Sequence, residues 1–124
     1  MAETVLTLDR TTDAPRRARA LVRQLEAALG PERTEDATLL ISELVTNAVK
    51  YGPEEGEIRV IVAREGLTVR FTVHDPGAGP LPEMRPSDSP PHEGGGHGLR
   101  LVDKVADRWG VKRGNPRMWF ELDL

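Results

Sequence analysis

A glutamate and an asparagine lie four residues apart, as Glu43 and Asn47, within a long helical pattern. At this spacing their side chains project side by side from one face of a helix and could reach one ligand together. The asparagine carbonyl oxygen suits a hard cation such as Mg²⁺, and a carboxylate can take a proton from a hydroxyl or from water. Solvated helix faces carry the same residue types, so the pair by itself leaves both interpretations open.

Asp75 ends a strand-like segment and opens the turn Asp75-Pro76-Gly77-Ala78-Gly79. The alternation of the strand continues to Asp75 and places it on the inner face, where a carboxylate needs hydrogen-bond donors. The exocyclic amine of adenine is such a donor, and Gly77 and Gly79 would let a ligand approach the backbone closely. An Asx turn that ends a hairpin explains the same residues.

A glycine cluster, Gly94-Gly95-Gly96-His97-Gly98-Leu99, precedes a helical pattern. Free amide groups and the dipole at a helix N-terminus can hold phosphate oxygens. The cluster is not a Walker loop, because no Gly-Lys-Ser/Thr follows, and a dinucleotide-binding fold would place its glycines after the first strand. A flexible linker is the alternative.

The elements that must position these residues follow from the spacing of apolar side chains. A helix that starts at about 31 or 33 and ends at 51 has a buried stripe and a polar flank, and that flank holds Asp36, Glu43, Asn47 and Lys50. A first helix begins at the Asp13 cap and ends at Gly30. The other expected elements are an edge strand over 4–8, a hairpin of strands 57–64 and 67–74 with its turn at 65–66, a helix over 99–106, and strands over 108–113 and 118–124.

The segment from Asp75 to Gly98 contains six prolines and six glycines in 24 residues, which predicts a long functional loop. In the second hairpin strand the apolar face is expected to consist of Leu67, Val69, Phe71 and Val73. Four arginines crowd the first half of the first helix, where they form either a solvated face or a surface for an acidic partner: Arg16, Arg17, Arg19 and Arg23.

The composition fits one globular domain over residues 1–124, and it excludes several kinds of site. The chain has no cysteine, so thiolate metal sites, thiol nucleophiles and disulfides are absent. A net charge of -3 argues against direct nucleic-acid binding, and the sequence contains no long apolar run, so we expect a cytoplasmic protein without a membrane segment. His74, His92 and His97 lack the paired spacing of a metal site.

The order and spacing of the three motifs together resemble the N, G1 and G2 boxes of the gyrase, heat-shock chaperone and histidine-kinase ATPase superfamily, which has the Bergerat fold. The corresponding segments are Glu43 to Gly52, Asp75-x-Gly77-x-Gly79, and Gly96 to Leu99. Within this superfamily the short build resembles the bacterial anti-sigma factor serine kinases. The resemblance covers nearly the whole chain, including the closing segment 118–122.

The resemblance implies an α+β, two-layer sandwich in which three helices cover one face of a mixed, mostly antiparallel sheet. It implies that Asn47 binds the Mg²⁺ that bridges the ATP phosphates, that Glu43 is the general base toward a serine hydroxyl, and that Asp75 accepts from the adenine amine. Segment 80–95 would be the ATP lid. The other implied nucleotide-binding residues are Lys50, Gly77, Gly79, Gly96, His97, Gly98 and Leu99.

The implied function is an anti-sigma regulatory factor that binds a sigma factor and phosphorylates an antagonist protein. The family resemblance also implies a homodimer. Two features depart from the family pattern: no threonine lies in 114–118, where Asn115 could substitute, and 86–97 contains no lysine or arginine. Because phosphoryl transfer needs cationic compensation, these features favour ATP binding over catalysis. The alternatives are a catalytically silent nucleotide-binding regulator and a structural module that binds no nucleotide.

Overall fold

The computed structural model describes residues 2–51, 56–75, 96–112 and 117–124, and all structural statements below refer to them. The strands are β1 (Ala2–Asp9), β2 (Glu57–Glu65), β3 (Thr68–His74), β4 (Arg108–Lys112) and β5 (Arg117–Asp123). The helices are α1 (Ala14–Gln24), α2 (Glu26–Leu29), α3 (Pro31–Tyr51) and α4 (Gly96–Val105).

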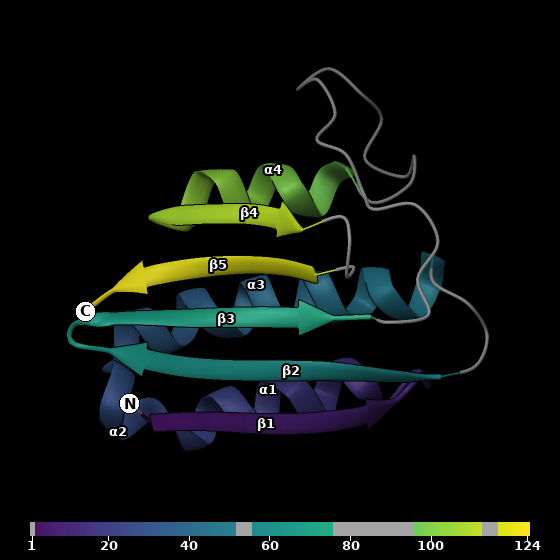
Figure 1. The fold of residues 1–124 in the computed structure, drawn as a ribbon, viewed down its shortest axis with the longest axis horizontal. Coiled ribbons are helices and arrows are strands. Elements are labelled where there is room, and N and C mark those ends of the chain that lie inside the picture. Colours follow the sequence, from purple (N-terminus) through teal and green to yellow (C-terminus); the bar gives the residue numbers. More distant parts are fainter. Residues whose placement is uncertain (1, 52–55, 76–95, 113–116) are drawn as a thin grey trace.

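The five described strands form one sheet in the order β1-β2-β3-β5-β4. All four pairings are antiparallel, so the described sheet has no parallel component, where a mixed and mostly antiparallel one was expected. The helices lie on one side of the sheet (Figure 1). The α+β, two-layer architecture and the edge position of β1 are confirmed.

Alternation along the strands builds the core between the two layers. In β3 and β5 every second side chain is buried, and Phe71 stacks on Phe120 with ring centroids 4.9 Å apart. Helix α3 fills the space above them with its apolar stripe, in which Ile41 and Val45 are fully buried. Burying these side chains fixes the rotation of α3, and that rotation decides which way its polar flank points.

Two expected elements differ in detail. The helix predicted from 14 to 29 breaks at Leu25, whose backbone has φ -95° and ψ 5° and whose N–H bonds to the Val22 carbonyl oxygen. The spacing of apolar residues in the sequence does not reveal this break. Leu21 and Leu29, on either side of it, are both buried, so the apolar pattern continues across the change in ψ.

The hairpin turn lies one residue later than predicted. Glu65 pairs with Thr68, so Gly66 and Leu67 form the loop, and Gly66 has the positive φ of 62° that tight hairpin turns require. Leu67 therefore lies outside the strand and is 67% exposed, and the prediction that it belongs to the apolar face was wrong.

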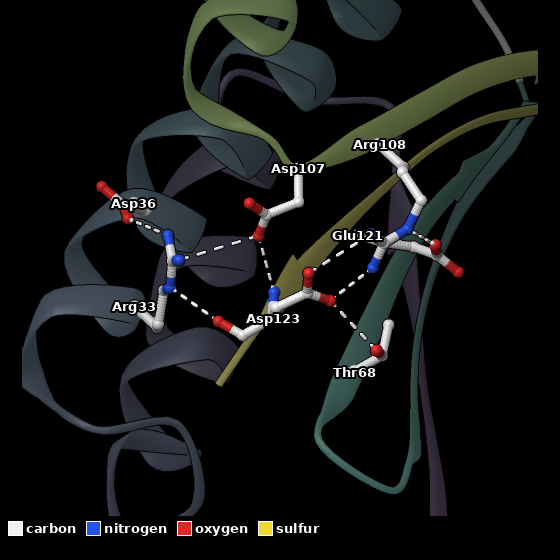
Figure 2. Close-up of polar contacts among 7 residues, drawn as sticks. All are labelled: Arg33, Asp36, Thr68, Asp107, Arg108, Glu121 and Asp123. Atoms are coloured by element: carbon white, nitrogen blue, oxygen red, sulfur yellow. Dashed lines mark hydrogen bonds and ion pairs between the residues drawn. The ribbon is translucent and has the colours of Figure 1, made fainter.

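A charged cluster closes the end of the sheet where the chain terminates (Figure 2). Arg108 donates from Nε to Glu121 Oε1 at 2.7 Å and also forms an ion pair with Asp123. Arg33 donates to the Asp123 backbone carbonyl at 2.9 Å, and the Asp107 carboxylate accepts from the Asp123 backbone N–H at 2.7 Å. The cluster joins α3, β4 and β5 at this end.

Acid should weaken this charged cluster. Hydrogen bonds from Arg108 hold the pKa of Glu121 below its ordinary 4.5 and the pKa of Asp123 below its ordinary 3.8. A carboxyl group whose pKa is lowered by folding contributes stability above its unfolded-state pKa, and the contribution is lost as pH falls through the folded-state pKa. The free energy of unfolding is thus expected to decrease as pH falls below about 5, and less steeply in Arg108→Met.

Urea unfolding between about pH 3 and pH 6 measures this effect. Arg16→Met is the matched control, because Arg16 pairs only with the exposed Asp13 at 2.8 Å. Its pH profile should follow that of the wild type. An Arg108→Met profile as steep as that of the wild type would show that the pairing of Arg108 with these carboxylates adds no acid-sensitive stability.

Candidate functional site

The segments that carry the candidate residues meet at one end of the sheet, opposite the end that holds the charged cluster around Arg108 and Asp123. The carboxyl end of β3, the last turns of α3 and the N-terminus of α4 all lie at this end (Figure 1). The end of β1 reaches it as well, because β1 and β3 both run antiparallel to β2. Asp75, Asn47 and Leu99 are therefore brought to one end of the domain by three different elements.

Asp75 is buried and is held by an arginine from beyond β1. Arg10 donates from Nη1 to Asp75 Oδ2 at 2.9 Å, and its Nη2 donates to Asp75 Oδ1. The same Nη1 donates to the backbone carbonyl of Ala48 at 2.6 Å. Since Ala48 follows Asn47 in α3, this arginine links the Asp75 carboxylate to the helix that carries the Glu–Asn pair.

Glu43 and Asn47 are both half-buried on α3, one turn apart. The neighbouring Leu44 and Val45 are buried in the core, so the pair lies at the border between the core and the surface. Lys50, one turn beyond Asn47, is exposed. The site thus has a carboxylate, an amide and an ammonium group on successive turns of one helix.

Asp36 does not share this site, although it falls on the same flank of α3. It forms an ion pair with Arg33 at 3.1 Å, near the charged cluster at the other end. Eleven residues of helix separate it from Asn47, a rise of about 16 Å. The polar flank is therefore divided between two ends of the domain.

Helix α4 begins at Gly96, three residues before the expected start at Leu99. The backbone N–H groups of its first turn, from Gly96 to Leu99, have no acceptor within the helix and concentrate the positive end of its dipole. Leu99 is 2% exposed and Val102 is 1% exposed, so the core anchors this turn. A helix N-terminus fixed in this way can present its amides to an anion.

Several predicted residues lie outside the described part of the chain. They are Gly77, Gly79, His92, the lid segment 80–95, Asn115 and the side chain of His97. Among the described residues, no group of three or more His, Asp or Glu side chains is arranged to hold a metal ion. None of the described helices has the length and apolar character that crossing a bilayer requires.

Comparison with known proteins identifies the family. Residues 6–122 match the histidine kinase-like ATPase domain. The chain belongs to this family. No curated protein sequence is significantly similar to it.

Among solved structures, this histidine kinase-like ATPase domain is similar to a chain from Mycobacterium tuberculosis that contains the RsbU and RsbW domains of Rv1364c. The TM-score is 0.70 and the sequence identity is 26%. The similarity covers 98% of the present domain and 32% of that longer chain.

The arginine-rich helix α1 of this ATPase domain is partly engaged within the chain itself. Arg19 donates to the Ser42 hydroxyl on α3 at 2.9 Å, and Arg16 pairs with Asp13 at 2.8 Å. Arg23 lies 3.9 Å from Glu35 on α3, and Arg17 is exposed. Arg19 and Arg23 therefore connect α1 to α3, whereas Arg16 and Arg17 lie on the surface.

Arg10 lies at the Asp75 end of the domain, although no sequence motif indicates it. It follows β1 directly and its side chain is only 2% exposed. Its acceptors lie 38 and 65 residues away in the sequence, so no local spacing indicates the contact. In the sequence, Arg10 is recognisable only as an arginine that closely follows a predicted strand. Many surface turns have an arginine at this position, so the pattern does not indicate a buried contact.

Proposed function

We propose that this histidine kinase-like ATPase domain binds ATP with Mg²⁺ in the cytoplasm and acts as an anti-sigma regulatory factor with serine kinase activity. It would sequester a sigma factor and phosphorylate a serine on an anti-anti-sigma partner. The observation that carries the proposal is the contact of Arg10 with both Asp75 and the Ala48 carbonyl. That contact supports one continuous site, with Asp75 at its adenine end and α3 along its phosphate end.

Each end of the proposed site has suitable chemistry. Asp75 is an acceptor for the adenine amine, and Gly77 and Gly79 would allow the base to approach the chain. The α4 amides from Gly96 to Leu99 would bind the phosphate oxygens, as would Lys50 from α3. A nucleotide site explains why the buried Asp75 carboxylate and the N-terminus of α4 lie at the same end of the domain. An Asx turn at Asp75 or a glycine linker before α4 would not require them to lie together.

The donor set near Asn47 fits Mg²⁺. This cation keeps several waters and binds through one or two protein oxygens together with substrate phosphates. Asn47 would hold it through the side-chain carbonyl oxygen, half-buried on a helix that the core fixes. When bound, Mg²⁺ would neutralise charge on the phosphates.

Glu43 is the proposed general base for phosphoryl transfer to a serine. It lies one turn before Asn47 on the same face of α3, so a hydroxyl that approaches the terminal phosphate would pass close to its carboxylate. Glu43 would orient this hydroxyl or accept its proton as the phosphorus–oxygen bond forms. A half-buried carboxylate remains accessible to a partner's serine.

The assignment of partners rests on similarity. The related chain from Mycobacterium tuberculosis carries an RsbW domain together with an RsbU domain, and the sequence motifs resemble those of anti-sigma factor serine kinases. A homodimer is part of this proposal. A catalytically silent, nucleotide-binding regulator is the second candidate, favoured by the lack of lysine and arginine in 86–97.

Calorimetric titration with ATP tests the nucleotide site. We expect saturable binding to the wild type in the presence of Mg²⁺ and at least tenfold weaker binding after chelation of Mg²⁺, since the loss of a charge-assisted contact costs about 1.5–3 kcal/mol. Asn47→Ala should bind ATP weakly with or without Mg²⁺. Ser42→Ala, whose hydroxyl faces Arg19 of α1, is the control and should bind as the wild type does.

The absence of binding heat at millimolar ATP would contradict the proposal and leave a structural module as the remaining function. Binding without phosphoryl transfer to the antagonist would instead select the silent regulator.

A further inference from the structure

Arg10 and Asp75 form a deeply buried ion pair. The side chain of Arg10 is 2% exposed and that of Asp75 is 10% exposed, whereas Arg70 and Arg108 are each 49% exposed. Burying a guanidinium ion is costly unless a counter-charge is close by, and the Asp75 carboxylate supplies that charge. The pair therefore occupies a defined place in the core, at the adenine end of the proposed site.

The geometry of the pair leaves Asp75 able to bind a ligand. Arg10 approaches with Nη1 and Nη2 side by side, one for each carboxylate oxygen, and this fork fixes the carboxylate plane. Each carboxylate oxygen has two lone pairs, so one bond from Arg10 leaves a further acceptor position on each. The carboxylate is thus oriented without being saturated.

The third acceptor ties this orientation to α3. Nη1 also donates to the Ala48 carbonyl at 2.6 Å, so the guanidinium cannot rotate without breaking a bond to the helix that carries Asn47. The Nε–H of Arg10 is buried and has no acceptor among the described residues. All described hydrogen bonds of the Arg10 side chain are therefore made by Nη1 and Nη2, to Asp75 and the Ala48 carbonyl.

We propose that Arg10 is a positioning residue that fixes the Asp75 carboxylate toward the 6-amino group of adenine and thereby sets the preference for adenine over 6-oxo purines. The inference rests on the proposed nucleotide site and adds a determinant of base specificity to it. An oriented carboxylate accepts from an amine and repels a 6-oxo group, which is itself an acceptor. Arg10 directs both N–H groups of Nη1 and one N–H group of Nη2 to Asp75 and Ala48, so the carboxylate is the group proposed to face the base.

Parallel binding measurements with ATP and inosine triphosphate test this role. The two ligands share the ribose and triphosphate and differ in the amine or oxygen at position 6 of the purine. We expect the wild type to prefer ATP by at least tenfold. With ATP the Asp75 carboxylate gains one charge-assisted hydrogen bond, and with inosine triphosphate it faces a second acceptor instead. Arg10→Lys keeps the charge but lacks the fork, so ATP affinity should fall about tenfold while inosine triphosphate affinity stays within a factor of two.

Arg19→Lys is the matched control. Arg19 also donates to α3, through the Ser42 hydroxyl at 2.9 Å, but it lies in α1, away from Asp75. The preference for ATP should remain unchanged in this variant. An equal loss of affinity for both ligands in Arg10→Lys, or an unchanged ratio, would overturn the inference and leave the proposed site intact.

The wild-type protein supplies a second readout that does not depend on a variant folding. The Nε–H resonance of Arg10 should shift on addition of ATP and shift much less with inosine triphosphate. Equal shifts with both ligands would overturn the inference. A wild type that binds neither triphosphate would overturn the proposed function instead, so the two failures are distinguishable.

Discussion

Replacing Asp75 by asparagine is expected to weaken ATP binding at least tenfold and to lower the free energy of unfolding by about 3 kcal/mol. The first effect follows from the loss of an anionic acceptor for the adenine amine. The second follows because Arg10, 2% exposed, would be left as a buried cation with only neutral acceptors. Breaking a buried ion pair by removing one partner is far more costly than removing an exposed pair.

Urea unfolding measures the stability of Asp75→Asn, and calorimetry at low temperature measures ATP affinity while the variant is folded. Asp13→Asn is the matched control, because its partner Arg16 is 69% exposed. This control should lose less than about 1 kcal/mol and bind ATP normally. A folded Asp75→Asn protein with wild-type ATP affinity would exclude Asp75 from the nucleotide site.

Replacing Glu43 by glutamine is expected to slow phosphoryl transfer about 10²–10⁴-fold, with ATP affinity nearly unchanged. Glutamine keeps the shape of the side chain on α3 but cannot accept the proton of the serine hydroxyl. The large effect on transfer and the small effect on binding separate a general base from a phosphate ligand.

Transfer is measured with γ-phosphate-labelled ATP and the cognate antagonist protein. Glu35→Gln is the control on the same helix, because Glu35 is 76% exposed and its partner Arg23 lies 3.9 Å away, on α1. This control should phosphorylate the antagonist as the wild type does. Equal labelling by Glu43→Gln would show that Glu43 is not the general base. The proton of the serine hydroxyl would then be accepted by the substrate phosphate or by water.

The sequence predicted the elements well where burial and periodicity act together. The helix over 31–51 has a stripe of apolar residues that the sheet buries; its end at Tyr51 matched the prediction, and its start at Pro31 is the earlier of the two predicted positions. The inward position of Asp75 also followed from strand parity, and the residue is 7% exposed. Features set by single backbone angles were not predictable in this way: the break at Leu25 and the hairpin loop at Gly66–Leu67 each depend on a local ψ or φ value.

In the candidate site, too, some residues could be predicted from the sequence and others could not. Glu43, Asn47 and Asp75 have recognisable types and spacing, so they could be proposed before the fold was known. Arg10 could not, because its role depends on the fold bringing its side chain within reach of the Ala48 carbonyl on α3 and of Asp75 after β3, residues far apart in the chain. A residue whose function depends on tertiary contacts alone leaves no periodic signal in the sequence.

Asp75, Asn47 and the first turn of α4 are proposed to face one bound nucleotide. Titration of the ¹⁵N-labelled protein with ATP and Mg²⁺, followed by NMR, tests this proposal most directly. We expect the backbone amides of Asp75 and Leu99 and the side-chain amide of Asn47 to shift along one binding curve, and those of Asp107 and Arg108 at the other end to stay in place. Shifts confined to the charged cluster, or shifts of Asn47 and Leu99 without Asp75, would contradict it.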